Sequence, residues 1–160
     1  MQRAHKLGVR VDMQNVFMWT KAETVARFLG KEVADRAVPI RSLIDILGIE
    51  NVGAGTDYST NVMNPFINMY VMVTRKDING NVYGKDQRVT REEALRLYTS
   101  SAARYTFEEG KKGSIEAGKL ADLVVLSDNL MTVADERIKD IKPLLTVVGG
   151  KTVFGDAKAL

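Results

Sequence analysis

The chain has 160 residues, a mass of 17.7 kDa and a formal net charge of +3. That length suits one ordinary domain or pieces of two, and it is too short for a complete eight-stranded α/β barrel of about 250 residues. The composition, 45% hydrophobic and 27% charged, is typical of a packed protein. With no cysteine and a single histidine, the chain alone cannot form a disulfide, a thiolate metal site or a histidine-rich zinc site.

The elements expected from the sequence alternate between strands and helices in the first part of the chain. In chain order they are a strand over 8–13, a helix from Thr20 to about Gly30, a short helix over 41–47, a strand over 51–56, a buried helix over 66–74, a hairpin tip at Asn79–Gly80, a helix running from Thr90 through Tyr105, and strands over 121–126, 143–148 and 151–154.

Local signals mark where several of these helices begin. Thr20 with Glu23, and Thr90 with Glu93, have the spacing of capping boxes, in which each side chain bonds the other residue's backbone N–H. Asn64, followed by a proline, predicts a third helix start. Strands dominate after about residue 110, so we expect a boundary at 110–112 that divides the chain into 1–110 and 111–160.

The basic and acidic residues are interleaved throughout the chain, and the densest basic run is the pair Lys111–Lys112. A nucleic-acid-binding protein clusters its basic residues, so nucleic acid is not the expected partner. No apolar run approaches the ~18 residues of a membrane span, and residues 1–6 lack the apolar core of a secretory signal. We therefore expect a cytoplasmic protein without a membrane partner.

Asp57 is the main candidate for chemistry. It follows the small-residue strand directly, and in alternating β/α folds the carboxyl ends of the strands face the active site. A carboxylate there could bind a divalent metal and accept a proton from a water molecule. The alternative is structural, since an aspartate in this position can also cap the turn that follows it.

Four further polar residues are weaker candidates. Asp12, Gln14 and Asn15 end the first strand and could line the same pocket as Asp57. His5 is the only histidine, but it lies in what reads as the last turn of a helix, where a histidine favours the helix dipole and is usually solvated.

The segments that carry a resemblance to a known family run along nearly the whole chain. They are Leu7-Gly8-Val9, Arg41-Ser42-Leu43, Gly55-Thr56-Asp57, Asn64-Pro65, Val73-Thr74-Arg75, Thr90 to Leu95, Tyr98-Thr99, Ala102-Ala103 and the stretch G-S-I-E-A-G-K-L-A-D-L-V-V-L over residues 113–126. The chain resembles the C-terminal end of the amidohydrolase superfamily, in particular the family 3 metal-dependent hydrolases, and the stretch over 113–126 is the most specific part.

The resemblance implies an α/β fold, with the last strand–helix units of a (β/α)8 TIM-like barrel over 1–110 and the C-terminal strands of a β-sandwich over 111–160. It implies that Asp57 binds the metal and acts as general base toward the hydrolytic water. The metal is a divalent cation, for which zinc is the first choice. Asp122, although it lies in the signature, is implied to be structural.

The departures from the family pattern are equally informative. The His-x-His pair, the bridging Lys or Glu and the two further histidines are absent, so the sequence matches only the last part of the enzyme. We expect a C-terminal fragment of a hydrolase acting on non-peptide C–N bonds of a small-molecule substrate, inactive alone and completed by the missing N-terminal barrel portion, by self-association or by a separate chain. The alternative is a non-catalytic binding or structural module that has kept the fold pieces.

Overall fold

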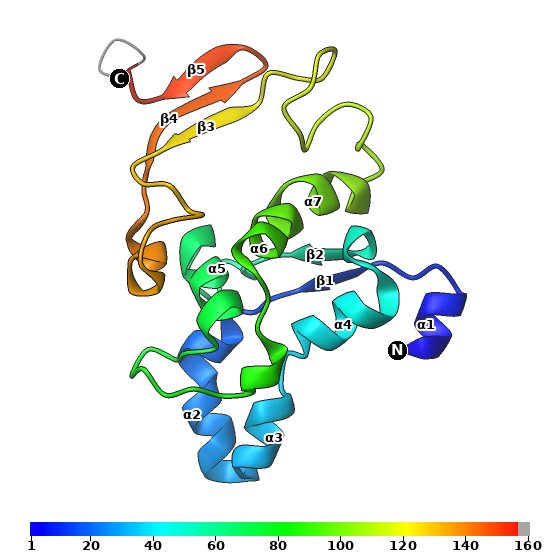
Figure 1. Cartoon of the computed structure of the whole chain (residues 1–160), viewed down its shortest axis with the longest axis vertical. Coiled ribbons are helices and arrows are strands. Elements are labelled where there is room, and N and C mark those ends of the chain that lie inside the picture. Colours follow the sequence, from blue (N-terminus) through cyan, green and yellow to red (C-terminus); the bar gives the residue numbers. More distant parts are fainter. Residues whose placement is uncertain (157–160) are drawn as a thin grey trace.

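The computed structural model describes residues 1–156, and the chain up to residue 105 is mainly helical around two short strands (Figure 1). The elements of this part are α1 (Gln2–Lys6), β1 (Val11–Met13), α2 (Phe17–Leu29), α3 (Lys31–Arg36), α4 (Ile40–Leu47), the 3-10 turn η1 (Ile49–Asn51), β2 (Val52–Ala54), α5 (Pro65–Thr74), η2 (Lys85–Gln87), α6 (Arg91–Tyr98) and α7 (Ser100–Tyr105).

The remainder forms a three-stranded antiparallel sheet and its connector. Strands β3 (Leu123–Leu126), β4 (Pro143–Val148) and β5 (Lys151–Phe154) pair in the order β3-β4-β5, and the turn η3 (Asp135–Asp140) lies between β3 and β4. The sheet lies beyond α6 and α7, and η3 lies against α5 (Figure 1). The expected hairpin after residue 148 is confirmed, since Val148 pairs with Lys151.

The parallel pair β1–β2 forms the other sheet. Val11 lies opposite Val52 and Met13 opposite Ala54, and the chain crosses from β1 to β2 through α2, α3 and α4. Parallel neighbours require such a crossover. The fold is therefore α/β with two small sheets, and no helix within residues 1–156 is both long and apolar enough to cross a membrane.

Two of the three helix starts predicted from capping residues are observed in the structure. The Thr90–Glu93 capping box is present with both of its hydrogen bonds, and the Asn64 side chain accepts from the Phe66 N–H at 2.8 Å. The capping box predicted at Thr20 is wrong, because α2 begins earlier, at Phe17. Glu23 instead accepts a hydrogen bond from the Asn79 side chain at 2.6 Å, so a tertiary contact replaces the local one.

The helix predicted from Thr90 through Tyr105 is interrupted. It breaks into α6 and α7 at Thr99, whose backbone (φ −122°, ψ −93°) leaves the helical region. The sequence predicts one apolar face that includes Leu97 and Tyr105. Leu97 of α6 is buried, but past the break Tyr105 is exposed and Ala103 is buried instead, so the predicted face does not continue into α7.

The core lies among α4, α5, α6 and β2, and the connector after β3 also contributes to it. Ile40, Leu47, Val52 and Leu97 are buried there. Leu130, Ile138 and Ile141 of the connector belong to the same cluster. The segment that leads into the antiparallel sheet is thus packed against the helical part.

Candidate active site at the carboxyl ends of the parallel strands

The two parallel strands separate apolar from polar side chains. Val11, Met13, Val52 and Ala54 pack into or against the core, as the alternation of a strand requires. The residue between the first two, Asp12, lies opposite Gly53 and is half-buried. On the face of the strand pair that is turned away from the core, the carboxylate of Asp12 on β1 therefore lies beside Gly53 of β2.

Asp12 fills the space that the glycines leave. A Cβ atom added to Gly53 would lie 3.2 Å from Asp12 Oδ1, and one added to Gly55 would lie 2.7 Å from Asp12 Oδ2. Gln14 Nε2 donates to Asp12 Oδ2 at 2.6 Å and orients the carboxylate. The structure thus brings Asp12 and Gln14 next to Gly55, which follows the end of β2 and lies two residues before Asp57.

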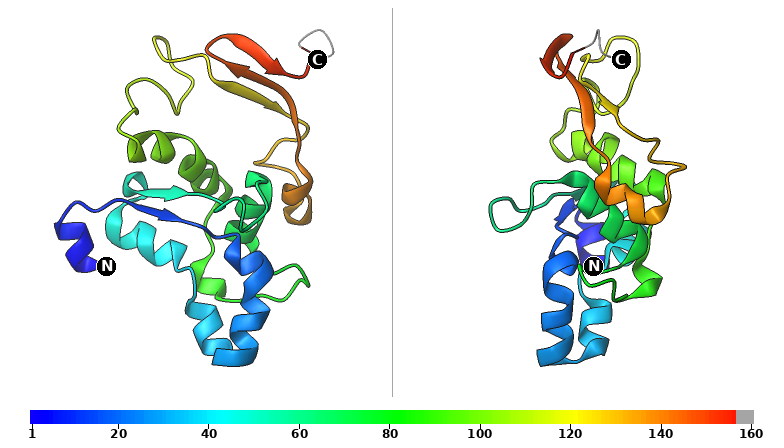
Figure 2. Two further views of the ribbon diagram at one scale, coloured as in Figure 1. Left: turned by 180° about the vertical axis from the view of Figure 1, so that it is seen from behind. Right: turned by 90° about the vertical axis from the view of Figure 1, so that its left-hand side faces the viewer.

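Asp57 itself lies just beyond this point, in the loop between β2 and α5, which projects from the body of the molecule (Figure 2, right). The residue is exposed and its φ is +52°. Its backbone carbonyl closes the following turn, accepting from the N–H groups of Thr60 at 2.9 Å and Asn61 at 3.2 Å. Within residues 1–156 the Asp57 carboxylate makes no hydrogen bond or ion pair, so its oxygens are available to a ligand.

Gly55 anchors the backbone that leads to Asp57. Its N–H donates to the Met13 carbonyl at 3.3 Å, which continues the pairing of β1 with β2. Its carbonyl accepts from Asn68 Nδ2 at 2.8 Å. The same Nδ2 donates to the Tyr98 hydroxyl at 2.6 Å, so β2, α5 and α6 meet at this amide.

Asn68 and Tyr98 were missed by reasoning from the sequence. Asn68 lies in a helix that is apolar nearly all round, and it is fully buried with its Oδ1 unpartnered. Burial raises the pKa of Tyr98 to about 12, a rise that the hydrogen bond from Asn68 opposes and the nearby charge of Asp12 supports. The hydroxyl therefore stays protonated at neutral pH. One signal was available, namely a lone polar residue in an otherwise apolar helix.

The other candidates lie apart from this group. Asn15 is buried and donates to the Met13 carbonyl at 3.2 Å, so it closes the strand end and does not line a pocket. His5 is exposed on α1, beyond the amino end of β1 (Figure 1). Asp122 accepts from the Gly149 N–H at 2.8 Å and supports the β4–β5 turn.

A metal implied by the resemblance would find one ligand here. Within the described part of the chain no three His, Cys, Asp or Glu side chains come together to hold an ion. A catalytic zinc needs three protein ligands. The exposed carboxylate of Asp57 could supply one oxygen ligand. The other ligands would have to come from outside residues 1–156.

The comparisons with known proteins agree on one family. The family model described as "Amidohydrolase family" matches residues 1–154. The chain is 34% identical over 112 residues to an N-substituted formamide deformylase of Arthrobacter pascens, an alignment that covers 70% of this chain and 20% of that protein. The chain spans between 20% and 29% of the lengths of the curated relatives that it matches.

Two solved structures are similar as well. Both are uncharacterised metal-dependent hydrolases. The one from Pyrococcus furiosus is 30% identical with a TM-score of 0.60, over 74% of this chain and 23% of that chain. The one from Pyrococcus horikoshii is 26% identical with a TM-score of 0.69, over 84% of this chain and 27% of that chain.

Proposed function

The chain belongs to the amidohydrolase family, and from that premise we propose that it is the C-terminal part of a metal-dependent hydrolase that cleaves C–N bonds other than peptide bonds. Two findings support this proposal. The chain spans only a small part of the length of its curated relatives, and the similar solved structures are metal-dependent hydrolases. Alone, the chain is proposed to be inactive.

We propose that β1 and β2 are the last two strands of a (β/α)8 barrel, and that β3–β5 are part of a β-sandwich. The division proposed is 1–110 for the barrel part and 111–160 for the sandwich part. The parallel pairing of β1 with β2 and the antiparallel pairing of β3–β5 support it. The missing N-terminal portion of the barrel would be the partner of both sheets.

Asp57 carries the proposed chemistry. When bound, the divalent metal, with zinc as the first choice, polarises the substrate carbonyl and lowers the pKa of water. The Asp57 carboxylate would serve as one metal ligand and as the base that takes the proton of the attacking water and passes it to the leaving nitrogen. Asp12 and Gln14 would line the wall beside it. The relative from Arthrobacter pascens suggests N-substituted formamides as the first substrates to test.

The observation that carries the proposal is the position of Asp57. Its exposed carboxylate has no partner within residues 1–156, and it follows a parallel strand at the carboxyl end, where active sites of α/β barrels lie. A surface aspartate with a purely structural role would be expected to cap a turn, whereas here the backbone carbonyl closes the turn.

The test is Asp57→Asn in the full-length enzyme. We expect a loss of kcat of roughly 10²-fold or more, because the general base disappears, and an unchanged melting temperature of the metal-free enzyme, because the side chain is exposed. Asp122→Asn is the matched control. Its oxygen still accepts from Gly149, so activity should be retained. Wild-type turnover by Asp57→Asn would refute the assignment of Asp57 as general base.

A further inference from the structure

The amide of Asn68 is buried in a helix whose buried neighbours are mainly apolar. Asn68 lies in α5, among buried Phe66, Met69 and Met72, and has no solvent exposure. Burying an amide costs free energy unless its polar atoms are paired, and Oδ1 is unpaired here. The Asn68 amide makes two hydrogen bonds, to the Gly55 carbonyl and to the Tyr98 hydroxyl, and these offset part of the free energy lost on burial.

The first of these hydrogen bonds ends at the backbone of Gly55. Gly55 has no side chain to limit its rotation, and it lies two residues before Asp57. β2 itself ends at Ala54, so Gly55 is already outside the strand. With the N–H of Gly55 bound to Met13 and its carbonyl bound to Asn68, the peptide groups on both sides of the residue are restrained.

Tyr98 in turn fixes the Asn68 amide. Tyr98 ends α6, whose start is fixed by the capping box of Thr90 and whose Leu97 is fully buried. The ring therefore projects from a well-anchored helix. The hydroxyl at 2.6 Å from Nδ2 selects the orientation in which the second amide proton points to Gly55. Three elements are joined by two hydrogen bonds.

We propose that Asn68 and Tyr98 are positioning residues that set the direction in which Asp57 leaves β2. This inference rests on the proposed function of Asp57 and adds the two residues that orient its carboxylate. Neither residue touches the reacting atoms. A displacement of a catalytic group by about 1 Å can cost about 10²-fold in rate, and residues that orient a metal ligand are typically worth 10- to 100-fold in metal affinity or activity.

The experiment measures Co²⁺ binding to the full-length enzyme, stripped of metal and titrated by equilibrium dialysis, together with kcat, KM and the melting temperature. The variants are Asn68→Ala and Tyr98→Phe. We expect each to weaken Co²⁺ binding by about 10- to 100-fold and to lower kcat with little change in KM. If Asn68→Ala fails to fold, Tyr98→Phe decides alone, because it removes a single hydroxyl.

Tyr70→Phe is the matched control. Tyr70 is buried, whereas Tyr98 is half-buried, and the Tyr70 hydroxyl donates to Glu136 at 2.8 Å, on the side of α5 that faces η3. Its loss should lower the melting temperature and leave Co²⁺ affinity unchanged. The inference is overturned if Tyr98→Phe binds Co²⁺ like the wild type, or if Tyr70→Phe weakens binding equally.

Asp57→Ala separates the two hypotheses. If it loses Co²⁺ affinity while Asn68→Ala and Tyr98→Phe keep theirs, Asp57 is a ligand and the positioning role is wrong. If Asp57→Ala binds Co²⁺ as tightly as the wild type, the proposed function itself fails.

Discussion

Arg75, among residues 1–156, is the largest side chain with almost no solvent exposure, and its charge is neutralised by no directly bonded carboxylate. Nε donates to the Tyr83 carbonyl at 2.9 Å, Nη1 to Val38 at 3.0 Å and Nη2 to Ala37 at 2.9 Å. Burial lowers the pKa of Arg75 to about 10, and the charges of Asp86 and Asp35 oppose that shift. The guanidinium holds together the end of α5 and two loops.

Arg75→Lys is therefore predicted to be far from conservative. An ammonium group lacks the planar fork that reaches three carbonyls at once, and unpaired buried carbonyls cost about 1–3 kcal/mol each. We expect the free energy of unfolding to fall by roughly 2–4 kcal/mol. Urea unfolding of the full-length enzyme, wild type against variant, measures it. A loss below about 0.5 kcal/mol would contradict the account.

At the level of single residues, the sequence predicts a role for Asp57 but none for Asn68 or Tyr98. Asp57 follows a strand signal, and the resemblance adds its proposed role. The contacts of Asn68 join residues 13 and 30 positions apart, and no local pattern encodes which distant atoms an amide will meet. The sequence indicates Arg75 only as part of a family motif. It does not predict the contacts of the guanidinium, because the carbonyls that it binds lie in separate loops.

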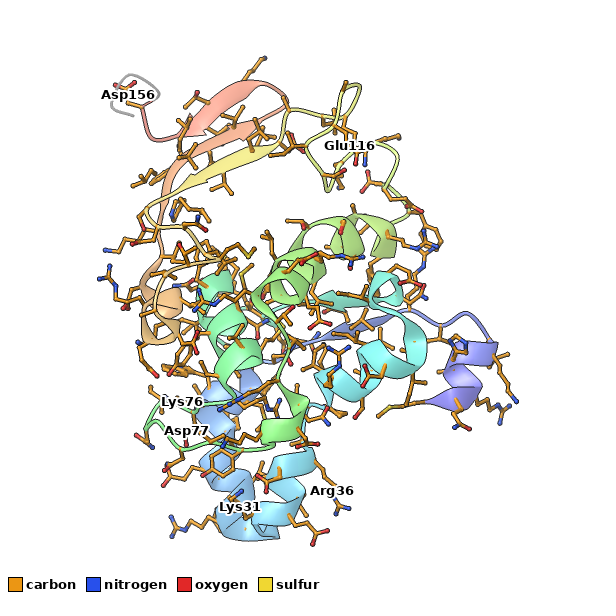
Figure 3. All side chains as sticks on the ribbon, viewed as in Figure 1. Lys31, Arg36, Lys76, Asp77, Glu116 and Asp156 are labelled. Carbon is orange, nitrogen blue, oxygen red and sulfur yellow. The ribbon has the colours of Figure 1, made fainter. Side chains whose placement is uncertain are left out.

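At the scale of elements, a carboxylate of η3 joins this turn to α5 and to the residue just past its end. Glu136 pairs with Lys76 and accepts from Tyr70 at 2.8 Å. Lys76 lies just past the end of α5, near η3 (Figure 3). The hydrogen bond from Lys76, followed by that from Tyr70, holds the pKa of Glu136 below its usual range. Arg91, the first residue of α6, donates to the Leu130 carbonyl at 2.9 Å and so joins the connector before η3 to α6.

This pKa shift predicts a pH dependence. A carboxyl group with a lowered folded-state pKa stabilises the fold above its unfolded pKa of about 4.3, and the stabilisation disappears as pH falls through the folded value. Glu136→Gln in the full-length enzyme should lower the urea midpoint at pH 7 and have a smaller effect at about pH 3. The effect should be small, because the side chain is 57% exposed.

A matched substitution separates this tie from an ordinary surface pair. Glu32 pairs with Arg36 within α3, with both side chains largely exposed, so Glu32→Gln should leave the urea midpoint unchanged at either pH. If both substitutions changed the urea midpoint at pH 7 by the same amount, the contacts of Glu136 between η3 and α5 would contribute no more to stability than an exposed ion pair.

Most elements could be predicted because their signals are local. The helices starting at Asn64 and Thr90 carry their caps in the sequence, and both were found. α3 was missed, since its six residues are too few for a periodic pattern and it follows directly on α2. Both parallel strands are shorter than predicted, at three residues each, because their length depends on neighbours that a local pattern does not contain.

At the scale of the whole molecule, the antiparallel sheet leaves apolar side chains exposed. The exposed positions on its strands are Leu123, Val124, Val125, Leu144, Val148, Val153 and Phe154. A cavity of about 690 Å³ separates α6 and α7 from β3, and its walls include Leu95, Ala102 and Leu126. Apolar surface of this kind drives association, and a two-stranded sheet such as β1–β2 is only marginally stable on its own.

We therefore predict that the isolated chain does not behave as a stable monomer. Unpaired strand edges are templates for pairing with other chains, so light scattering at micromolar concentration should show oligomers or aggregates. Co-expression with the N-terminal barrel portion should replace them with a defined complex. A compact 17.7 kDa monomer with a cooperative melt would contradict the prediction and favour a self-sufficient module.

The central claim is that Asp57 lies at the metal of a barrel active site, and anomalous diffraction from crystals of the full-length enzyme tests it most directly. The account predicts a metal peak about 2.0–2.2 Å from a carboxylate oxygen of Asp57, with Asn68 bonded to the carbonyl of Gly55. A metal held entirely by other residues, with Asp57 turned to solvent, would contradict it.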